Sequence, residues 1–243
     1  MHQTHKLTPV LLGITGLANA GKDTLAQLLA THCGARTMAF SDGIYAEVAE
    51  AFDCTITDLA LRNTKEQPQP WLALVHCRDV AFVQRMQDHL AAQGHALDLM
   101  APRSPRTILE WWGTEYRRHQ NPAYWVHTVR QRIQRLRSVG CKMPIVISDV
   151  RKVDEAAMLR ELGGHLWRIT RPGSEVQTGH ATSTTGQEFA PDLTLINCHD
   201  IAHLQGLALV HWGELVRRHA PVNKIKAFKQ SLATNDLGWH DLD

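Results

Sequence analysis

A glycine-rich segment, Gly16-Leu-Ala-Asn-Ala-Gly21-Lys22-Asp23-Thr24, has the residue types and spacing of a loop that binds phosphate groups. It departs from the usual G-x-x-x-x-G-K-[ST] pattern because Asp23 follows the lysine and the hydroxyl comes one residue later, at Thr24. Glycines let the backbone curl so that N–H groups point inward, and a helix that starts there adds the positive end of its dipole. Lys22 would reach the β- and γ-phosphates. We predict that a nucleoside triphosphate is held by Gly16, Asn19, Ala20, Gly21, Lys22, Asp23 and Thr24.

A second chemical signal is Asp149, which follows the apolar run Pro144-Ile-Val-Ile-Ser and so ends a predicted strand. In α/β folds with a phosphate-binding loop, such a carboxylate can hold magnesium directly or through water. A carboxylate at Asp23, beside a triphosphate, also needs a cation between the two, although helix capping is an equal alternative. We therefore predict Mg²⁺ near Asp23, Thr24 and Asp149. Arg151 would point to the same side, or form a salt bridge with Asp149.

Arginines form the third signal. Arg106, Arg117 and Arg118 flank the aromatic segment Trp111-Trp112-Gly113-Thr114-Glu115, and guanidinium groups suit the negative charge of two phosphorylated substrates. The run from 130 to 137 is read instead as a solvated helix face, with a nucleic-acid-binding stripe as the alternative. The tryptophans Trp111, Trp112 and Trp125 could stack on a base, but aromatic residues at helical spacing more often belong to a core.

Strand and helix patterns alternate along the chain. This alternation favours a parallel sheet covered on both faces, which would position these residues. The patterns predict strands at 10–15, 36–40, 144–149, 165–170 and 192–196. They predict helices from about Asp23, 45–52, 79–93, 104–119, 121–138, 154–162 and 201–218, a polar loop at 62–71 and a partly ordered segment after Pro221.

Composition excludes several classes of protein. The 243 residues carry a formal net charge of +2, which does not favour a general nucleic-acid coat, and no apolar run approaches the roughly 20 residues of a membrane span. We expect no membrane partner, and a cytoplasmic protein without a leader segment. The five cysteines include no C-x-x-C pair, so no disulfide framework or zinc site is indicated. His199 and His203 are spaced i, i+4 but lack the Glu of H-E-x-x-H, so no metal is expected there.

Several segments resemble the bacteriophage-type deoxynucleoside monophosphate kinases, from about residue 10 to about residue 210. The most specific are Pro105-Arg106-Thr-Ile-Leu-Glu-Trp-Trp-Gly113-Thr114-Glu115-Tyr-Arg117-Arg118 and Ile147-Ser-Asp149-Val-Arg151. The others are the loop at 16–24, Arg62-Asn-Thr-Lys65-Glu66-Gln-Pro68, Asn121-Pro-Ala-Tyr-Trp125-Val and Arg171-Pro172-Gly173.

The resemblance implies a three-layer α/β P-loop NTPase fold of the nucleoside monophosphate kinase type, with a mainly parallel sheet. Residues 1–220 would form one domain, with a helical acceptor-binding insertion at about 42–140, a lid-like loop at about 171–191 and a C-terminal tail at 221–243. The reaction implied is transfer of the γ-phosphoryl group of ATP, with Mg²⁺, to a deoxynucleoside 5′-monophosphate. The cytoplasm would be the host's if the protein is phage-encoded, and a homodimer is left open.

The resemblance also assigns residues to roles. Catalysis would involve Lys22, Arg106, Arg117, Asp149 and Arg151, and Arg171 would contact ATP. The acceptor would be bound by Asp42, Arg62, Lys65, Arg106, Trp112, Thr114, Glu115, Arg117, Arg118, Trp125 and Arg151.

This chain departs from the family pattern at several positions. Lys152 and Asp154 stand where the family often has an aromatic residue and Asn, and His180-Ala-Thr182-Ser183-Thr184 lacks the Glu of H-x-S-E. Alternatives are therefore a P-loop kinase of another small acceptor, such as dephospho-coenzyme A, or a nucleic-acid-binding P-loop protein. A guanine-nucleotide switch is disfavoured because no N-K-x-D motif follows a strand.

Overall fold

A single parallel sheet organises the computed structural model of the chain, which describes residues 9–173 and 188–219. Its strands are β1 (Leu11–Thr15), β2 (Arg36–Met38), β3 (Ile145–Ile147), β4 (His165–Thr170) and β5 (Leu193–Ile196). Their order across the sheet is β2-β3-β1-β4-β5, and all neighbours are parallel. The phosphate-binding loop follows β1, so it leaves the carboxyl edge of the central strand. Ligands of open α/β sheets bind at this edge.

Alternation along the strands supplies both faces of the sheet with apolar side chains. In β1, Leu11 packs into one core, whereas Leu12 and Ile14 pack into the other. In β3, Ile145 and Ile147 face the first core and Val146 faces the second. Because every strand position points to a face, both faces need a helical cover.

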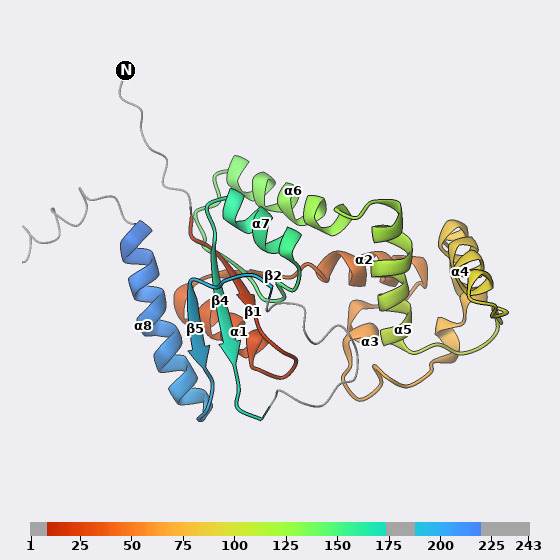
Figure 1. Cartoon of the computed structure of the whole chain (residues 1–243), viewed down its shortest axis with the longest axis horizontal. Coiled ribbons are helices and arrows are strands. Elements are labelled where there is room, and N and C mark those ends of the chain that lie inside the picture. Colours follow the sequence, from red (N-terminus) through yellow and green to blue (C-terminus); the bar gives the residue numbers. More distant parts are fainter. Residues whose placement is uncertain (1–8, 174–187, 220–243) are drawn as a thin grey trace, which may run out of the picture.

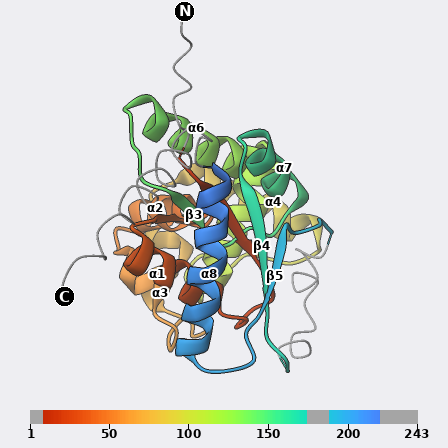
Figure 2. The same ribbon diagram turned by 90° about the vertical axis from the view of Figure 1, so that its left-hand side faces the viewer.

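Two helices cover one face and two others cover the opposite face. The first pair is α1 (Lys22–Cys33) and α8 (Ile201–His219), which pack on each other; Figure 2, seen from the α8 side, shows them next to each other. The second pair is α6 (Tyr124–Ser138) and α7 (Val153–Glu161), and Figure 1 shows them together on the far side of the sheet from α8. The result is the three-layer α/β architecture that the sequence predicts.

Between β2 and α6 the chain forms a helical region that extends away from the sheet (Figure 1). It contains α2 (Asp42–Ala51), α3 (Ile56–Ala60), α4 (Val80–Ala92) and α5 (Pro105–Glu110), followed directly by the π-helix η3 (Trp111–Arg118). Two short 3₁₀ helices, η1 (Pro70–Leu72) and η2 (Leu74–His76), lie in the segment between α3 and α4.

The predicted elements are confirmed apart from shifted ends and one change of helix type. The predicted helix at 104–119 is α-helical only to Glu110 and then widens into η3. In this π-helix, Trp112 and Tyr116 both pack on Phe82 of α4, with ring centroids 4.6 and 5.5 Å away. Such π segments occur often at functional sites, and the apolar period used for the prediction does not distinguish them from α-helix. The segment after residue 220 and most of the lid-like loop, including His180 to Thr184, lie outside the described residues.

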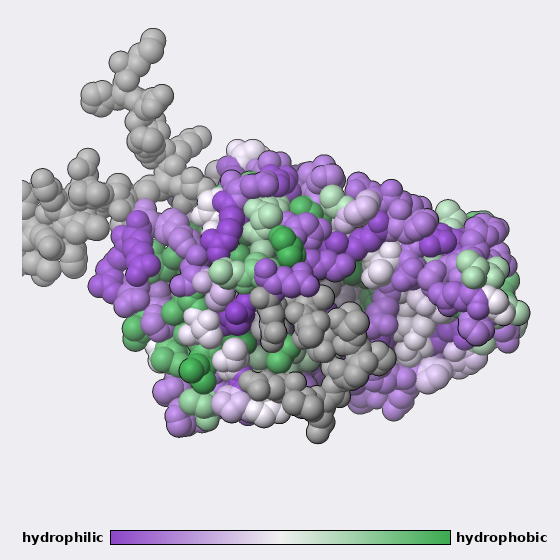
Figure 3. Space-filling model, viewed as in Figure 1, coloured by the Kyte–Doolittle hydropathy of each residue, from purple (hydrophilic) through white to green (hydrophobic). Residues whose placement is uncertain are grey.

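Among residues 9–173 and 188–219, no helix is long and apolar enough to cross a membrane. Figure 3 shows that hydrophobic residues gather at the lower left, over β5 and α8, while the helical region is mostly hydrophilic. The exposed apolar side chains there include Ile196, Ile201, Leu209, Val210 and Val216.

Candidate active site

The backbone of the glycine-rich loop has the geometry of a phosphate cradle. Gly16 and Gly21 have φ values of 148° and 107°, and Asn19 has φ 61°, all in the region that favours glycine or asparagine. A Cβ atom on Gly16 would lie 2.2 Å from the carbonyl oxygen of Ile169, so no larger residue fits against β4. The loop then enters α1 at Lys22, which directs the free N–H groups of the first turn toward it.

Lys22 lies folded over this loop. Its Nζ donates to the carbonyl oxygens of Gly16 (2.9 Å) and Leu17 (2.7 Å). Burial lowers the pKa of Lys22, the charge of Arg151 lowers it further, and Asp23 and Asp149 raise it. These three predicted site residues therefore act on the charge of Lys22, although Asp23 lies in α1 and the other two follow β3, more than 120 positions away in the sequence.

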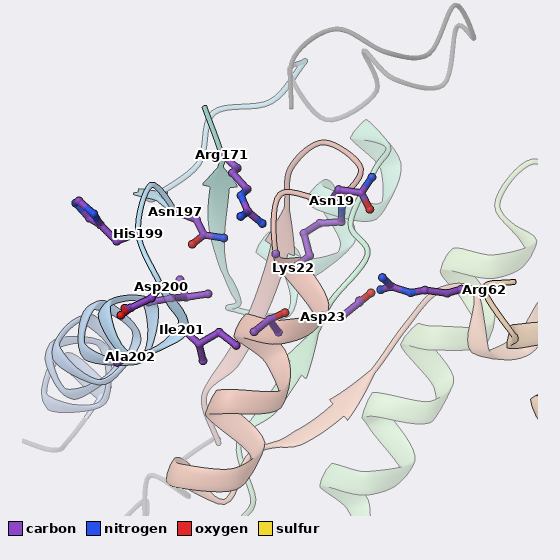
Figure 4. A pocket seen from close by; sticks show the side chains of 13 residues that line it. Asn19, Lys22, Asp23, Arg62, Arg171, Asn197, His199, Asp200, Ile201 and Ala202 are labelled. Carbon is purple, nitrogen blue, oxygen red and sulfur yellow. The ribbon is translucent and has the colours of Figure 1, made fainter. Parts of the chain in front are cut away.

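A pocket of about 740 Å³ opens beside the loop (Figure 4), within the range of small-molecule sites. Figure 4 shows Arg62 reaching toward Asp23 from the helical region, with Arg171 and Asn197 on the opposite side. The structure thus places Arg62, predicted at the acceptor, and Arg171, predicted at ATP, around the same pocket as the loop residues. The pocket is lined by Asn19, Gly21, Lys22, Asp23, Thr24, Arg62, Arg171, Asn197, His199, Asp200, Ile201, Ala202 and Leu204.

Asp149 is buried and both of its carboxylate oxygens accept backbone hydrogen bonds. Oδ1 accepts from the N–H of Phe40 (2.6 Å) and Oδ2 from the N–H of Ser41 (3.0 Å). These bonds hold the end of β2 and the start of α2 against β3. Each oxygen keeps a further lone pair, so the carboxylate remains able to accept a magnesium-bound water. Together with the hydroxyl of Thr24 and the carboxylate of Asp23, it provides the oxygen donors that Mg²⁺ prefers.

The predicted acceptor residues Lys65 and Arg106 lie next to each other in the helical region. The N–H of Arg106 donates to the carbonyl oxygen of Lys65 (3.0 Å), and the Lys65 Nζ donates to the hydroxyl of Tyr45 (2.6 Å). The Arg106 guanidinium pairs with Glu66 and is half exposed. The contact of Lys65 with Tyr45 is one that the sequence reasoning missed.

Glu47 organises a second cluster and was also missed by the sequence reasoning. Its Oε2 accepts from Arg117 Nε and from Trp112 Nε1, each at 2.7 Å, and its Oε1 accepts from the Tyr124 hydroxyl at 2.7 Å. The Arg117 guanidinium also lies 4.6 Å from the centroid of the Tyr116 ring. Three partners from two other elements meet on this one carboxylate. No sequence signal marks Glu47, because the nearest partner is 65 positions away.

The tryptophans of the predicted acceptor site are core residues. Trp112 is 1% exposed and Trp125 is 2% exposed, and Trp125 Nε1 donates to the carbonyl oxygen of Gly113. Because both rings are buried, neither has a face open for stacking on a base. The two tryptophans therefore act as core residues. Thr114 is exposed, whereas the Glu115 carboxylate lies 3.4 Å from His89 of α4.

Asp42 is held by two contacts at the start of α2. Its Oδ2 accepts from the N–H of Ala39 (3.0 Å) and from Arg132 Nη1 of α6 (3.1 Å). The sequence predicts Asp42 at the end of the second strand, but β2 ends at Met38 and Asp42 is the first residue of α2, with its carboxylate already engaged.

Glu155 links the segment of Arg151 to the helical region. Its Oε2 accepts from the N–H groups of Arg151 (2.8 Å) and Lys152 (3.1 Å), and its Oε1 pairs with Arg118 Nη2 (2.8 Å). Arg118 also contacts Asp154, so its guanidinium is engaged in supporting α7. Burial raises the pKa of Glu155 to about 7, and the nearby charge of Asp149 adds to the rise.

This raised pKa predicts a pH-dependent stability. Glu155 holds its proton more tightly in the folded chain (pKa about 7) than in the unfolded one (4.5), so its contribution is present below pH 4.5 and is lost as the pH rises through 7. The free energy of unfolding should fall by about 2–3 kcal/mol between pH 5 and pH 8 through this group. Glu155→Gln should remove that part of the slope, as measured by urea unfolding at both pH values.

Glu161→Gln is the matched control, because Glu161 is an exposed carboxylate on the same helix, paired with Arg130. It should leave the slope unchanged. An equal slope in Glu155→Gln and the native chain would show that Glu155 does not titrate in this range.

Most of the described arginines of α6 have partners in the fold. Arg130 pairs with Glu161, Arg132 with Asp42, and Arg137 donates to the carbonyl oxygen of Leu162. These contacts tie α6 to α7 and α2.

Comparison with known proteins adds one sequence relative. No family model matches the chain. A protein of Acanthamoeba polyphaga mimivirus, named "Putative deoxynucleotide monophosphate kinase", is 25% identical over 203 residues, which cover 77% of this chain and 88% of the viral protein.

Solved structures overlap most of the chain at low identity. A sugar kinase from Janibacter sp. HTCC2649 has a TM-score of 0.42 at 14% identity and covers 88% of this chain and 99% of its own. A gluconokinase from Sinorhizobium meliloti 1021 has a TM-score of 0.41 at 15% identity, with coverage of 86% and 95%. TT1252 from Thermus thermophilus has a TM-score of 0.43 at 15% identity, with coverage of 85% and 98%.

The strand order β2-β3-β1-β4-β5, with the phosphate-binding loop after β1 and the helical region after β2, decides the fold. The chain has the fold of a P-loop kinase. The carboxylate after β3 and the helical region beside the loop are consistent with the nucleoside monophosphate kinase variant of this fold.

Proposed function

We propose that this P-loop kinase transfers the γ-phosphoryl group of ATP to the phosphate of a deoxynucleoside 5′-monophosphate. One observation carries the proposal: Arg62 of the helical region lines the same pocket as Lys22, Asp23 and Thr24. The donor cradle and a cationic region that follows β2 therefore share one opening. The name of the mimivirus protein supports the deoxynucleotide acceptor.

In this proposal the glycine-rich loop, with Lys22, binds the triphosphate of ATP, and Arg171 contacts ATP from the end of β4. The helical region at about 42–140 binds the acceptor through Arg62, Lys65 and Arg106. Thr24, Asp23 and Asp149 would hold Mg²⁺, which neutralises phosphate charge when bound.

The residues act mainly by positioning and by charge. A phosphate monoester is ionised near neutral pH, so its oxygen can attack without a general base. Charge spreads over the oxygens of the transferred group, and the cations of Lys22, Arg106 and Arg151 would stabilise it. Arg117, held by Glu47, would keep the acceptor side of the site in place.

The test is a panel of acceptors assayed by coupled release of ADP with ATP and magnesium. It should include the four deoxynucleoside monophosphates, their ribonucleotide counterparts and dephospho-coenzyme A. We expect turnover with at least one deoxynucleotide. Turnover with dephospho-coenzyme A but with no deoxynucleotide would overturn the proposal and would indicate a kinase of another small acceptor instead.

A further inference from the structure

We propose that Cys198, His199 and His203 form a binding site for a soft divalent transition metal of the Zn²⁺ class. They lie between β5 and the first turn of α8, and each offers one ligand atom within 4.8 Å of the other two. A tetrahedral zinc ion, with bonds of about 2.0–2.3 Å, holds its ligand atoms roughly 3.3–3.6 Å apart. Since all three side chains are exposed, small rotations can close this difference.

The backbone holds the three ligands close together before any metal binds. On one side, the N–H of Asn197 donates to Thr170 (2.7 Å) and its side chain Nδ2 donates to Ala20 (3.0 Å). On the other side, Asp200 Oδ1 accepts from the N–H of His203 (2.9 Å) and so caps α8. These bonds order the backbone on both sides of the cluster, so only the exposed side chains must be ordered when a metal binds.

The ligand types select the metal. One thiol and two imidazoles suit zinc or cobalt, whereas magnesium prefers oxygen ligands. The His199 and His203 rings lie with centroids 4.6 Å apart at 74°, and each has a nitrogen within 4.8 Å of the other's and of the Cys198 sulfur. Three protein ligands leave a fourth position open to water.

The site is separate from the phosphate-binding loop. His199 contributes to the rim of the pocket, but Figure 4 shows its side chain directed away from Lys22. The proposal does not depend on the identity of the phosphate acceptor.

Cobalt titration of the full, untagged chain provides the test, because a cobalt–thiolate bond gives a charge-transfer absorption band. We expect a saturable band at one cobalt per chain that Zn²⁺ displaces and excess Mg²⁺ does not. Cys198→Ser should abolish the band, and His203→Ala should weaken cobalt affinity about tenfold or more.

Cys141→Ser and His127→Ala are the matched controls, because these residues lie outside the cluster and should leave the titration unchanged. Circular dichroism of each variant checks that the chain is folded. Absence of a saturable band, displacement by Mg²⁺, or a band that survives Cys198→Ser would overturn the proposal.

Discussion

Lys22→Ala is expected to lower the turnover number by about 1,000-fold or more while leaving the fold intact. The Lys22 ammonium lies within the loop, where Gly16 and Leu17 accept its hydrogen bonds. Triphosphate oxygens would replace these carbonyls, and no other lysine stands in the loop to take its place. The effect is measured as the rate of ADP release at saturating ATP and acceptor.

Stability should change little, because the lost contacts are to loop carbonyls at the edge of the pocket. Thermal unfolding should show a midpoint within a few degrees of the native chain. Lys142→Ala is the matched control, since Lys142 is exposed between α6 and β3, and it should keep full activity. Activity of Lys22→Ala above about a tenth of the native rate would contradict the assignment of the loop.

Arg106→Ala is expected to lower kcat/KM for the acceptor by about 100- to 1,000-fold. The guanidinium is half exposed and pairs with Glu66, so it can leave Glu66 and neutralise an incoming phosphate. Loss of an interaction that strengthens in the transition state lowers kcat, whereas loss of one that serves binding alone raises KM. Steady-state kinetics with the acceptor varied at saturating ATP separates these two effects.

Arg106→Lys should recover part of the activity, because it keeps the charge but loses the two-pronged geometry. Arg130→Ala is the control, since Arg130 pairs with Glu161 on the opposite side of the sheet from α8. Near-normal kinetics of Arg106→Ala would show that the acceptor binds elsewhere.

Much of the sheet could be predicted because the residue patterns that indicate its strands are local in the sequence. The run Leu11 to Thr15, the loop after it and the strand ending before Asp149 are each read from a few neighbouring residues. Parallel strands with both faces covered follow from the alternation of strands and helices. By the same logic, Asp149 and the loop had to meet at one edge of the sheet.

The helical region was less predictable, because its contacts join distant positions. Glu47 binds Trp112, Arg117 and Tyr124, which lie 65 to 77 positions away in the sequence. The resemblance assigns Arg118 to the acceptor, but a sequence pattern cannot show that Glu155 is its partner. For a related reason, the spacing of His199 and His203 predicts no metal, because no local pattern adds Cys198 to them.

The sequence by itself determined the phosphate-binding loop, the order of strands and helices, and the cationic character of the segment around Arg106. These depend on backbone preferences and on apolar periods within about ten residues. Only the tertiary structure decided which charged side chains remain available to bind a substrate. It buried Trp112 and Trp125, engaged Arg117 and Arg118 with carboxylates, and brought Arg62 to the rim of the loop. Pairing and burial depend on which surfaces meet when the chain folds, and no local pattern contains that information.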